Sequence, residues 1–149
     1  MSMIPERYAA YEKTVTVGAI NFAAVPGDKA ATLDKMEQNI REAARQGVNI
    51  ISFPEEALIG VRECAACRAE APHCDYHDAL AETVPGPTTE YLYELCKELD
   101  IYVIFGLAER DAQRPDVLYN AAAVVGPEGI QGIDLRSLPC RQERSRHRD

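Results

Sequence analysis

Residues 14 to 53 follow one pattern, and it restricts the fold more than any other part of the chain. Thr14 to Phe22 alternates and is rich in β-branched residues, which predicts a strand. From Lys29 to Gln46 apolar residues recur every three or four positions, as on one face of an amphipathic helix, and Gly47 is a natural end for it. Val48 to Phe53 predicts a second strand. This order, with short connections, predicts a parallel pair in an α/β fold.

The second part of the chain continues the α/β pattern. A Pro/Gly turn with a threonine N-cap candidate precedes a predicted helix from Thr89 to Leu99, and "IYVIFGLAE" then predicts a strand. The run "LYNAAAVVGPEG" predicts another strand that ends in a turn between Gly126 and Gly129. We expect the chain to reverse there into an antiparallel partner.

Composition excludes several classes of protein. The 149 residues suffice for one domain, and their apolar runs are far shorter than the roughly 18 residues of a membrane span. The first residues lack the basic and apolar regions of a secretory signal, so we expect a cytoplasmic location and reduced thiols for the five cysteines. The net charge of −8 argues against general nucleic-acid binding, which favours a positive surface.

Two carboxylates, Glu55 and Glu56, follow the second predicted strand after a single proline. Ligand sites in open α/β sheets lie beyond the carboxyl ends of the parallel strands. A carboxylate at that edge, half desolvated by its apolar neighbours, would have a raised pKa and could serve as a general base. The alternative is that the pair caps the next turn or faces water, and position alone does not decide between the two.

Four segments of the chain, taken in order, resemble a known family. They are "VTVGAINF", "ARQGVNIISFPEEALIG", "VPGPTTEYLYELCKELDIYVIFGLAER" and "LYNAAAVVGPEGIQG", with Phe53-Pro54-Glu55 and Tyr119-Asn120 as the most specific pieces. Together they resemble the N-terminal half of the nitrilase superfamily, the carbon-nitrogen hydrolases. The resemblance implies a four-layer α-β-β-α sandwich, of which this chain would form an incomplete part. It also implies hydrolysis of small-molecule amides or nitriles without a cofactor.

The resemblance gives Glu55 the role of general base in a Glu-Lys-Cys triad, with Glu56 as a neighbour. In this chemistry a thiolate attacks the substrate carbon, a lysine ammonium stabilises the oxyanion, and the glutamate moves protons. Tyr119 and Asn120 would support the pocket near the base. The plain interpretation of Asn120 is a polar residue at a strand start that is hydrogen-bonded to nearby backbone.

The chain departs from the family where the lysine and the cysteine are expected. Arg136-Ser137 and Leu138-Pro139 stand in place of Tyr-Arg-Lys and the downstream Leu-Pro, and the last lysine of the chain is Lys97. None of the five cysteines occupies the nucleophile position. Because members of a catalytic unit depend on one another, we expect a truncated chain that is inactive alone. The alternative is a non-catalytic pseudoenzyme or a zinc-binding partner module.

Composition divides the chain into three parts. We expect an N-terminal extension at 1–13, the N-terminal part of a carbon-nitrogen hydrolase domain at 14–132, and a disordered tail at 133–149. The tail holds five arginines and a net charge of +2, which leaves −10 for the rest. A frameshifted or prematurely ended reading of a longer gene would explain this ending, and so would a genuine short paralogue.

The segment "CAACRAEAPHCDYH" combines the ligand types of a tetrahedral zinc site. The candidates are Cys64, Cys67, Cys74 and His77, with His73 as a competitor for the fourth position. The six residues between the two pairs are few for a zinc ribbon or finger. Free thiols beside a variable pocket explain the pattern as well, so we expect no metal and keep these residues as candidates.

An incomplete sandwich would lack the second sheet that normally covers its inner face. We expect that face to carry apolar residues such as Val17, Ile51 and Ile104. A large apolar patch that is open to water favours association. The chain is therefore expected to form a dimer or higher homo-oligomer through the open sheet face, or else to aggregate.

Overall fold

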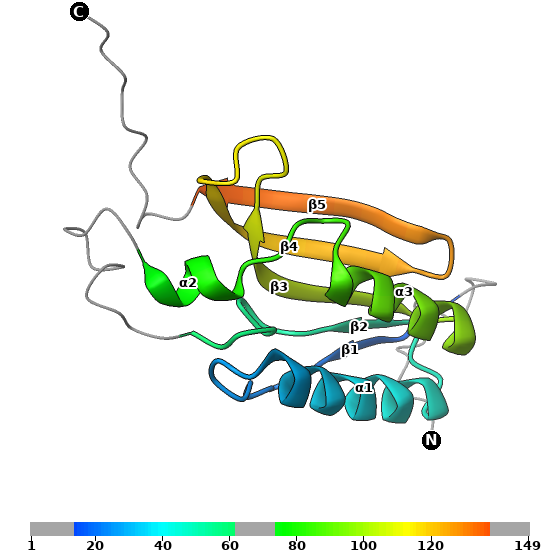
Figure 1. The fold of residues 1–149 in the computed structure, drawn as a ribbon. Coiled ribbons are helices and arrows are strands. Elements are labelled where there is room, and N and C mark those ends of the chain that lie inside the picture. The colour runs from blue at the N-terminus through cyan, green and yellow to red at the C-terminus, as the bar shows by residue number, and fades with distance from the viewer. Residues whose placement is uncertain (1–13, 62–73, 138–149) are drawn as a thin grey trace, which may run out of the picture.

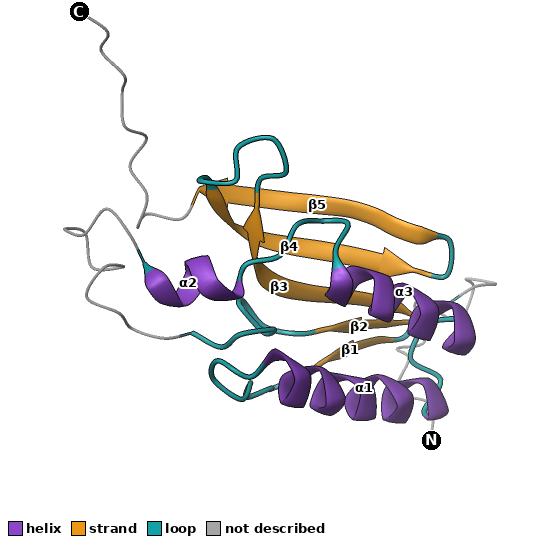
Figure 2. Cartoon of the chain, viewed as in Figure 1, coloured by secondary structure: helices purple, strands orange, loops and turns teal. Residues whose placement is uncertain are grey.

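The computed structural model describes residues 14–61 and 74–137. Within these ranges the chain forms one mixed sheet with helices packed on it (Figures 1 and 2). The elements, in chain order, are β1 (Val17–Ala19), α1 (Lys29–Arg45), β2 (Ile50–Ser52), α2 (Asp75–Leu80), α3 (Pro87–Leu99), β3 (Tyr102–Arg110), β4 (Leu118–Gly126) and β5 (Gly129–Ser137).

The strands lie in the same order in the sheet as in the chain, from β1 to β5. β1, β2 and β3 are parallel, because helices connect them, whereas β4 and β5 are antiparallel to their neighbours. The predicted parallel pair and the reversal after Gly126 are therefore confirmed. β1 and β2 have only three residues each and are shorter than their predicted ranges.

Local capping explains where the helices begin and end. At the start of α1 the Asp28 carboxylate accepts a hydrogen bond from the Ala31 N–H at 3.0 Å. The helix ends at Arg45, one residue before its predicted end, and Gly47 follows with a φ of 75°. α3 begins at Pro87, where a missing N–H has no cost. The N-cap is Gly86, not a threonine as predicted; the Thr89 hydroxyl instead accepts a hydrogen bond from the Gly86 N–H at 2.9 Å.

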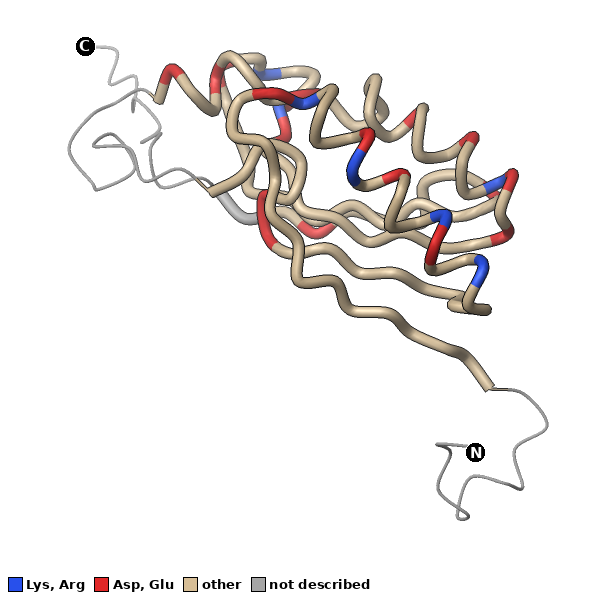
Figure 3. Tube along the Cα trace, turned by 90° about the horizontal axis from the view of Figure 1, so that it is seen from below, with Lys and Arg blue, Asp and Glu red and all other residues tan. Residues whose placement is uncertain are grey.

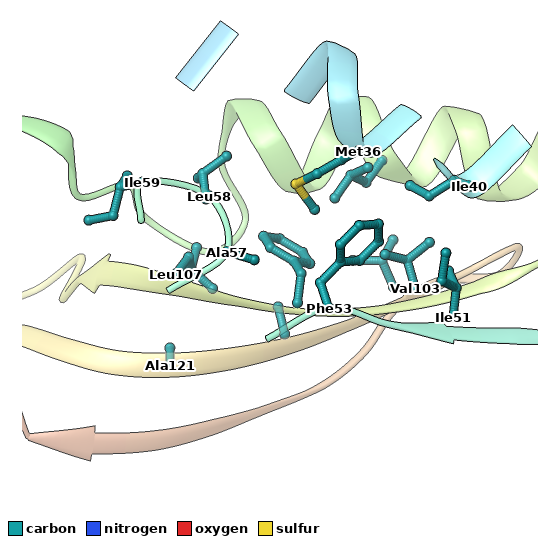
Figure 4. Packing of buried hydrophobic residues seen from close by; sticks show 14 of the residues in the cluster. Met36, Ile40, Ile51, Phe53, Ala57, Leu58, Ile59, Val103, Leu107 and Ala121 are labelled. Carbon is teal, nitrogen blue, oxygen red and sulfur yellow. The ribbon is translucent and has the colours of Figure 1, made fainter. Parts of the chain in front are cut away.

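The hydrophobic core lies between the sheet and the helices α1 and α3, which cover the same face (Figures 1 and 3). Charged residues gather on the helices and loops (Figure 3), so the apolar positions of each helix are left to face the strands. Burial of each large side chain contributes about 1.5–3 kcal/mol. The fully buried residues include Met36 and Ile40 of α1, Leu92 of α3, and Ile51, Val103 and Phe105 of the strands (Figure 4 shows part of this cluster).

Side chains alternate along each strand, so every second residue points away from α1 and α3. Val17 and Ile104 lie on this second face, and Val17 is 63% exposed. Ile51 was expected there too, and that expectation is wrong. Ile51 pairs with Val103, and both are completely buried on the helix-covered face.

Strand β5 crosses the predicted boundary at Gly132. Residues 133–137 form its second half and pair with β4, for example Leu135 with Ala121, so they do not belong to a disordered tail as predicted. Apolar and polar residues continue to alternate through this segment, so it pairs as a strand although its charge differs from that of the preceding residues. Residues 138–149 and the predicted extension 1–13 lie outside the described residues. In the part of the chain that the structure describes, no helix is long and apolar enough to cross a membrane.

Candidate functional site

A cavity of about 370 Å³ opens at the carboxyl end of β2. Most strand residues that line it, such as Ile104, Asn120 and Ala122, lie on the sheet face opposite α1 and α3. Phe105 and Ala121, which also line it, belong to the buried core. Such a volume suits a small organic molecule. The lining residues are Ser52, Phe53, Pro54, Glu55, Ile104, Phe105, Gly106, Asn120, Ala121, Ala122 and Asp134.

The backbone after β2 is shaped by a glycine on the neighbouring strand. The Phe53 N–H donates to the Ile104 carbonyl at 2.8 Å, which extends the parallel pairing by one residue. The peptide between Glu55 and Glu56 then lies against Gly106, where a Cβ would come within 2.4 Å of the Glu56 nitrogen. Glu56 has a φ of 48°, a left-handed conformation that is costly for a residue with a side chain. This turn sends the two carboxylates into different environments.

Glu55 lines the cavity at the sheet edge where the sequence placed it, but it is exposed and not half desolvated as expected. The Asn120 side-chain amide, from β4, donates a hydrogen bond to Glu55 Oε1. The plain interpretation of Asn120, a bond to nearby backbone, is therefore not what the structure has. An amide that donates to one carboxylate oxygen fixes the group and leaves its other oxygen available for a ligand.

Glu56 is buried, and its partners could not be recognised from the sequence. Its Oε1 lies 2.8 Å from Nε2 of His77, and Nδ1 of His77 lies 2.9 Å from Sγ of Cys74. Both imidazole nitrogens are thus engaged with different residues. Among the described residues no group of three candidate ligands could hold a metal ion. The other two zinc candidates, Cys64 and Cys67, lie outside the described residues.

Tyr119 does not line the cavity, although it was expected to support it. Its hydroxyl donates to Asp111 Oδ2 at 3.1 Å and accepts from Arg114 at 2.6 Å. Desolvation and the Asp111 bond raise the pKa of Tyr119, while the Arg114 and Gln113 N–H groups hold the pKa of Asp111 at about 2. Tyr119 therefore anchors the turn before β4, and Asn120, the next residue, faces the cavity.

Among the described residues that line the cavity, Glu55 and Asp134 are charged and none is a lysine, arginine or cysteine. Asp134 lies on β5, close to the segment where the family resemblance expects a lysine. Cys96 and Lys97 are on α3, and burial raises the pKa of Cys96 to about 12. A thiol with so high a pKa is a poor nucleophile at neutral pH. Among the described residues only one part of a hydrolytic triad is therefore in place.

Comparison with known proteins places the chain in a family. The model of the carbon-nitrogen hydrolases matches residues 15–147, so the chain belongs to that family and the resemblance is confirmed. An aliphatic nitrilase of Sinorhizobium fredii (strain HH103) is 34% identical over 134 residues, which cover 84% of this chain and 42% of the relative. Human omega-amidase NIT2 is 41% identical over 100 residues, or 66% of this chain and 31% of the relative. The chain spans less than half the length of both.

Solved structures show the same fold. The crystal structure of an N-terminal amidase matches 82% of this chain and 28% of its own with a TM-score of 0.64 and 23% sequence identity. A carbon-nitrogen hydrolase from Helicobacter pylori G27 matches 82% of this chain and 39% of its own with a TM-score of 0.63 and 17% identity. The sheet and its helices thus correspond to part of a nitrilase-type fold.

Proposed function

We propose that this chain supplies the general base of a carbon-nitrogen hydrolase and that Glu55 is that base. The hydrogen bond from Asn120 to Glu55, inside a cavity at a strand end, is the observation that carries the proposal. Held by the amide, the carboxylate would take a proton from an attacking thiol or water. Asn120 is then a positioning residue. The names of the relatives suggest nitriles and omega-amides as substrate classes.

The lysine and the cysteine of the reaction would come from outside these 149 residues. The described cavity offers no group for the oxyanion and no thiol, and Asp134 would repel a developing negative charge. The chain alone is therefore proposed to be inactive, as a truncated enzyme or a pseudoenzyme partner would be. A cytoplasmic location, in which the cysteines stay reduced, belongs to the same proposal.

Ammonia release from an aliphatic nitrile and an omega-amide tests this proposal. The chain alone should release none, and mass spectrometry should find no thioester on its cysteines. Co-expression with the remaining part of the Sinorhizobium nitrilase should restore hydrolysis, and Glu55→Gln should remove it. Glu94→Gln, which changes an exposed carboxylate on α3, is the matched control. Hydrolysis by the chain alone, or by the complemented Glu55→Gln variant, would contradict the proposal.

The open sheet face is proposed to bind a second copy of the chain. Val15 and Val17 are 64% and 63% exposed, and the same apolar strip is present in every copy. Light scattering should show a dimer or a larger assembly. Val17→Lys should shift the protein toward monomer, whereas Val61→Lys, at an equally exposed loop valine, should not. A monodisperse monomer of the unmodified chain would contradict this assembly.

A further inference from the structure

A second group of reactive side chains lies apart from the cavity. Cys74, His77 and Glu56 form a linear chain of contacts, with 2.9 Å from sulfur to Nδ1 and 2.8 Å from Nε2 to the carboxylate. None of the three lines the cavity around Glu55. Their order, thiol to imidazole to carboxylate, is that of a nucleophile, its base and the group that orients the base.

The proton positions follow from the contacts. A carboxylate can only accept hydrogen bonds, so the Glu56 contact places a proton on Nε2 of His77. In the neutral ring Nδ1 is then the acceptor, and it faces the Cys74 sulfur. The imidazole is therefore oriented to take the thiol proton when the sulfur attacks an electrophile.

Burial limits which electrophile can react. Cys74 is only 5% exposed, and His77 and Glu56 are buried as well. A bulky acyl substrate does not fit at a sulfur with so little exposed surface, whereas a small neutral molecule needs far less room. Hydrogen peroxide and related small peroxides have that size and charge, and thiols react with them readily.

We propose that Cys74 is a peroxide-reactive thiol activated by His77 and Glu56. The sulfur attacks one peroxide oxygen, an S–O bond forms and the O–O bond breaks. His77 takes the thiol proton and passes it to the leaving oxygen, which departs as water. Cys74 is oxidised by two electrons to a sulfenic acid, the peroxide is reduced, and an added thiol reverses the change.

Cys96 provides an internal control. It is completely buried on α3, its sulfur faces the Val125 carbonyl at 3.6 Å, and burial raises its pKa to about 12. Both cysteines are shielded from solvent, but among the described residues an imidazole lies beside Cys74 and none lies beside Cys96. Cys96 therefore gives the reactivity of a buried thiol without such a neighbour, and variants of His77 and Glu56 measure what these two residues add at Cys74.

The test is a timed oxidation of the folded chain with hydrogen peroxide. Catalase then removes the peroxide, the chain is unfolded in dimedone so that the reagent reaches both sulfurs, and peptide mass spectrometry locates the adducts. Cys74 should be trapped as its dimedone adduct at least about 100 times faster than Cys96, within the range that general base catalysis provides. His77→Gln should slow trapping at Cys74 by about the same factor. Glu56→Gln should slow it about tenfold or more, because an amide no longer dictates the tautomer.

Circular dichroism of each variant shows whether it remains folded, and the comparison of Cys74 with Cys96 in the unmodified chain needs no variant. The proposal is overturned if Cys74 reacts no faster than Cys96 in the unmodified protein. It is also overturned if a folded Glu56→Gln variant keeps the full rate. This outcome does not depend on the role of Glu55, because the assay involves neither the cavity nor a carbon-nitrogen substrate.

Discussion

The two faces of the sheet differ in what they contribute. The face under α1 and α3 is packed with apolar side chains such as Phe105, and among the described strand residues on it one is a carboxylate, Glu109, near the end of β3. The opposite face carries the cavity with Glu55 and Asp134, together with apolar residues that are partly open to water. Residues one position apart on a strand therefore serve stability on one side and chemistry on the other.

The test with the largest expected effect replaces one isoleucine on each face of the sheet. Ile51→Ala should lower the free energy of unfolding by about 2–5 kcal/mol, because it leaves a cavity in a fully buried cluster. Ile104→Ala, on the partly exposed face, should cost about 1 kcal/mol. Urea unfolding followed by circular dichroism measures both. Equal losses would mean that the second face is as tightly packed as the first.

The next test concerns the glycine beneath the two glutamates. Gly106→Ala places a Cβ 2.4 Å from the Glu56 nitrogen, so we expect a loss of about 1–3 kcal/mol and a displaced Glu55. Gly132→Ala is the control, since a Cβ there meets nothing within 4 Å. Thermal unfolding of the two variants should separate them clearly, and similar midpoints would show that the 55–56 peptide moves away easily.

A third test compares the adjacent carboxylates. Glu56→Ala leaves the buried His77 without its partner at Nε2, which should cost about 1–3 kcal/mol. Glu55→Ala removes an exposed side chain and should change stability by less than about 0.5 kcal/mol. Chemical unfolding of both variants gives the comparison. A large loss for Glu55→Ala would assign it a structural role that its exposure does not suggest.

The smallest expected effect is a dependence of the folding stability on pH. Burial, and secondarily the charge of Asp111, raises the pKa of Glu109 above its ordinary value of 4.5. The folded chain thus binds this proton more tightly than the unfolded chain, and the stability gained is present below about pH 4.5 and lost as pH rises through the raised pKa. The free energy of unfolding of Glu109→Gln, compared with that of the unmodified chain, should therefore increase as the pH rises from 4 to 7. A difference that is constant with pH would refute this.

Periodicity predicted the parts of the fold that depend on local pattern. The face of α1 that contains Met36 and Ile40 is the one expected, and Glu55 lies at the strand end where it was placed. The face of Ile51 was assigned wrongly, because a run of apolar residues does not reveal which of two neighbours points inward. The predicted boundary at Gly132 falls inside β5, because the change in charge there suggests a tail although the strand alternation continues past it.

The contacts of Glu56 could not be predicted from the sequence. His77 lies 21 residues further on, in the six-residue helix α2, which is too short to show a periodic pattern. The sequence indicates Cys74 and His77 only as zinc candidates, because it shows the types of side chain and not their arrangement in space. The imidazole contacts Glu56 because the turn there directs this carboxylate to the buried side, and the position of that turn depends on tertiary structure.

The strand order has a consequence for how copies of the chain can meet. β5 is the last strand of the described sheet and has nine residues, so its outer backbone groups form a long template for another strand. Pairing along this edge would make one continuous sheet and leave each cavity accessible to small solutes. Packing of the open faces would enclose the cavities instead. Accessibility of the cavity to a small solute would therefore report which of the two assemblies forms.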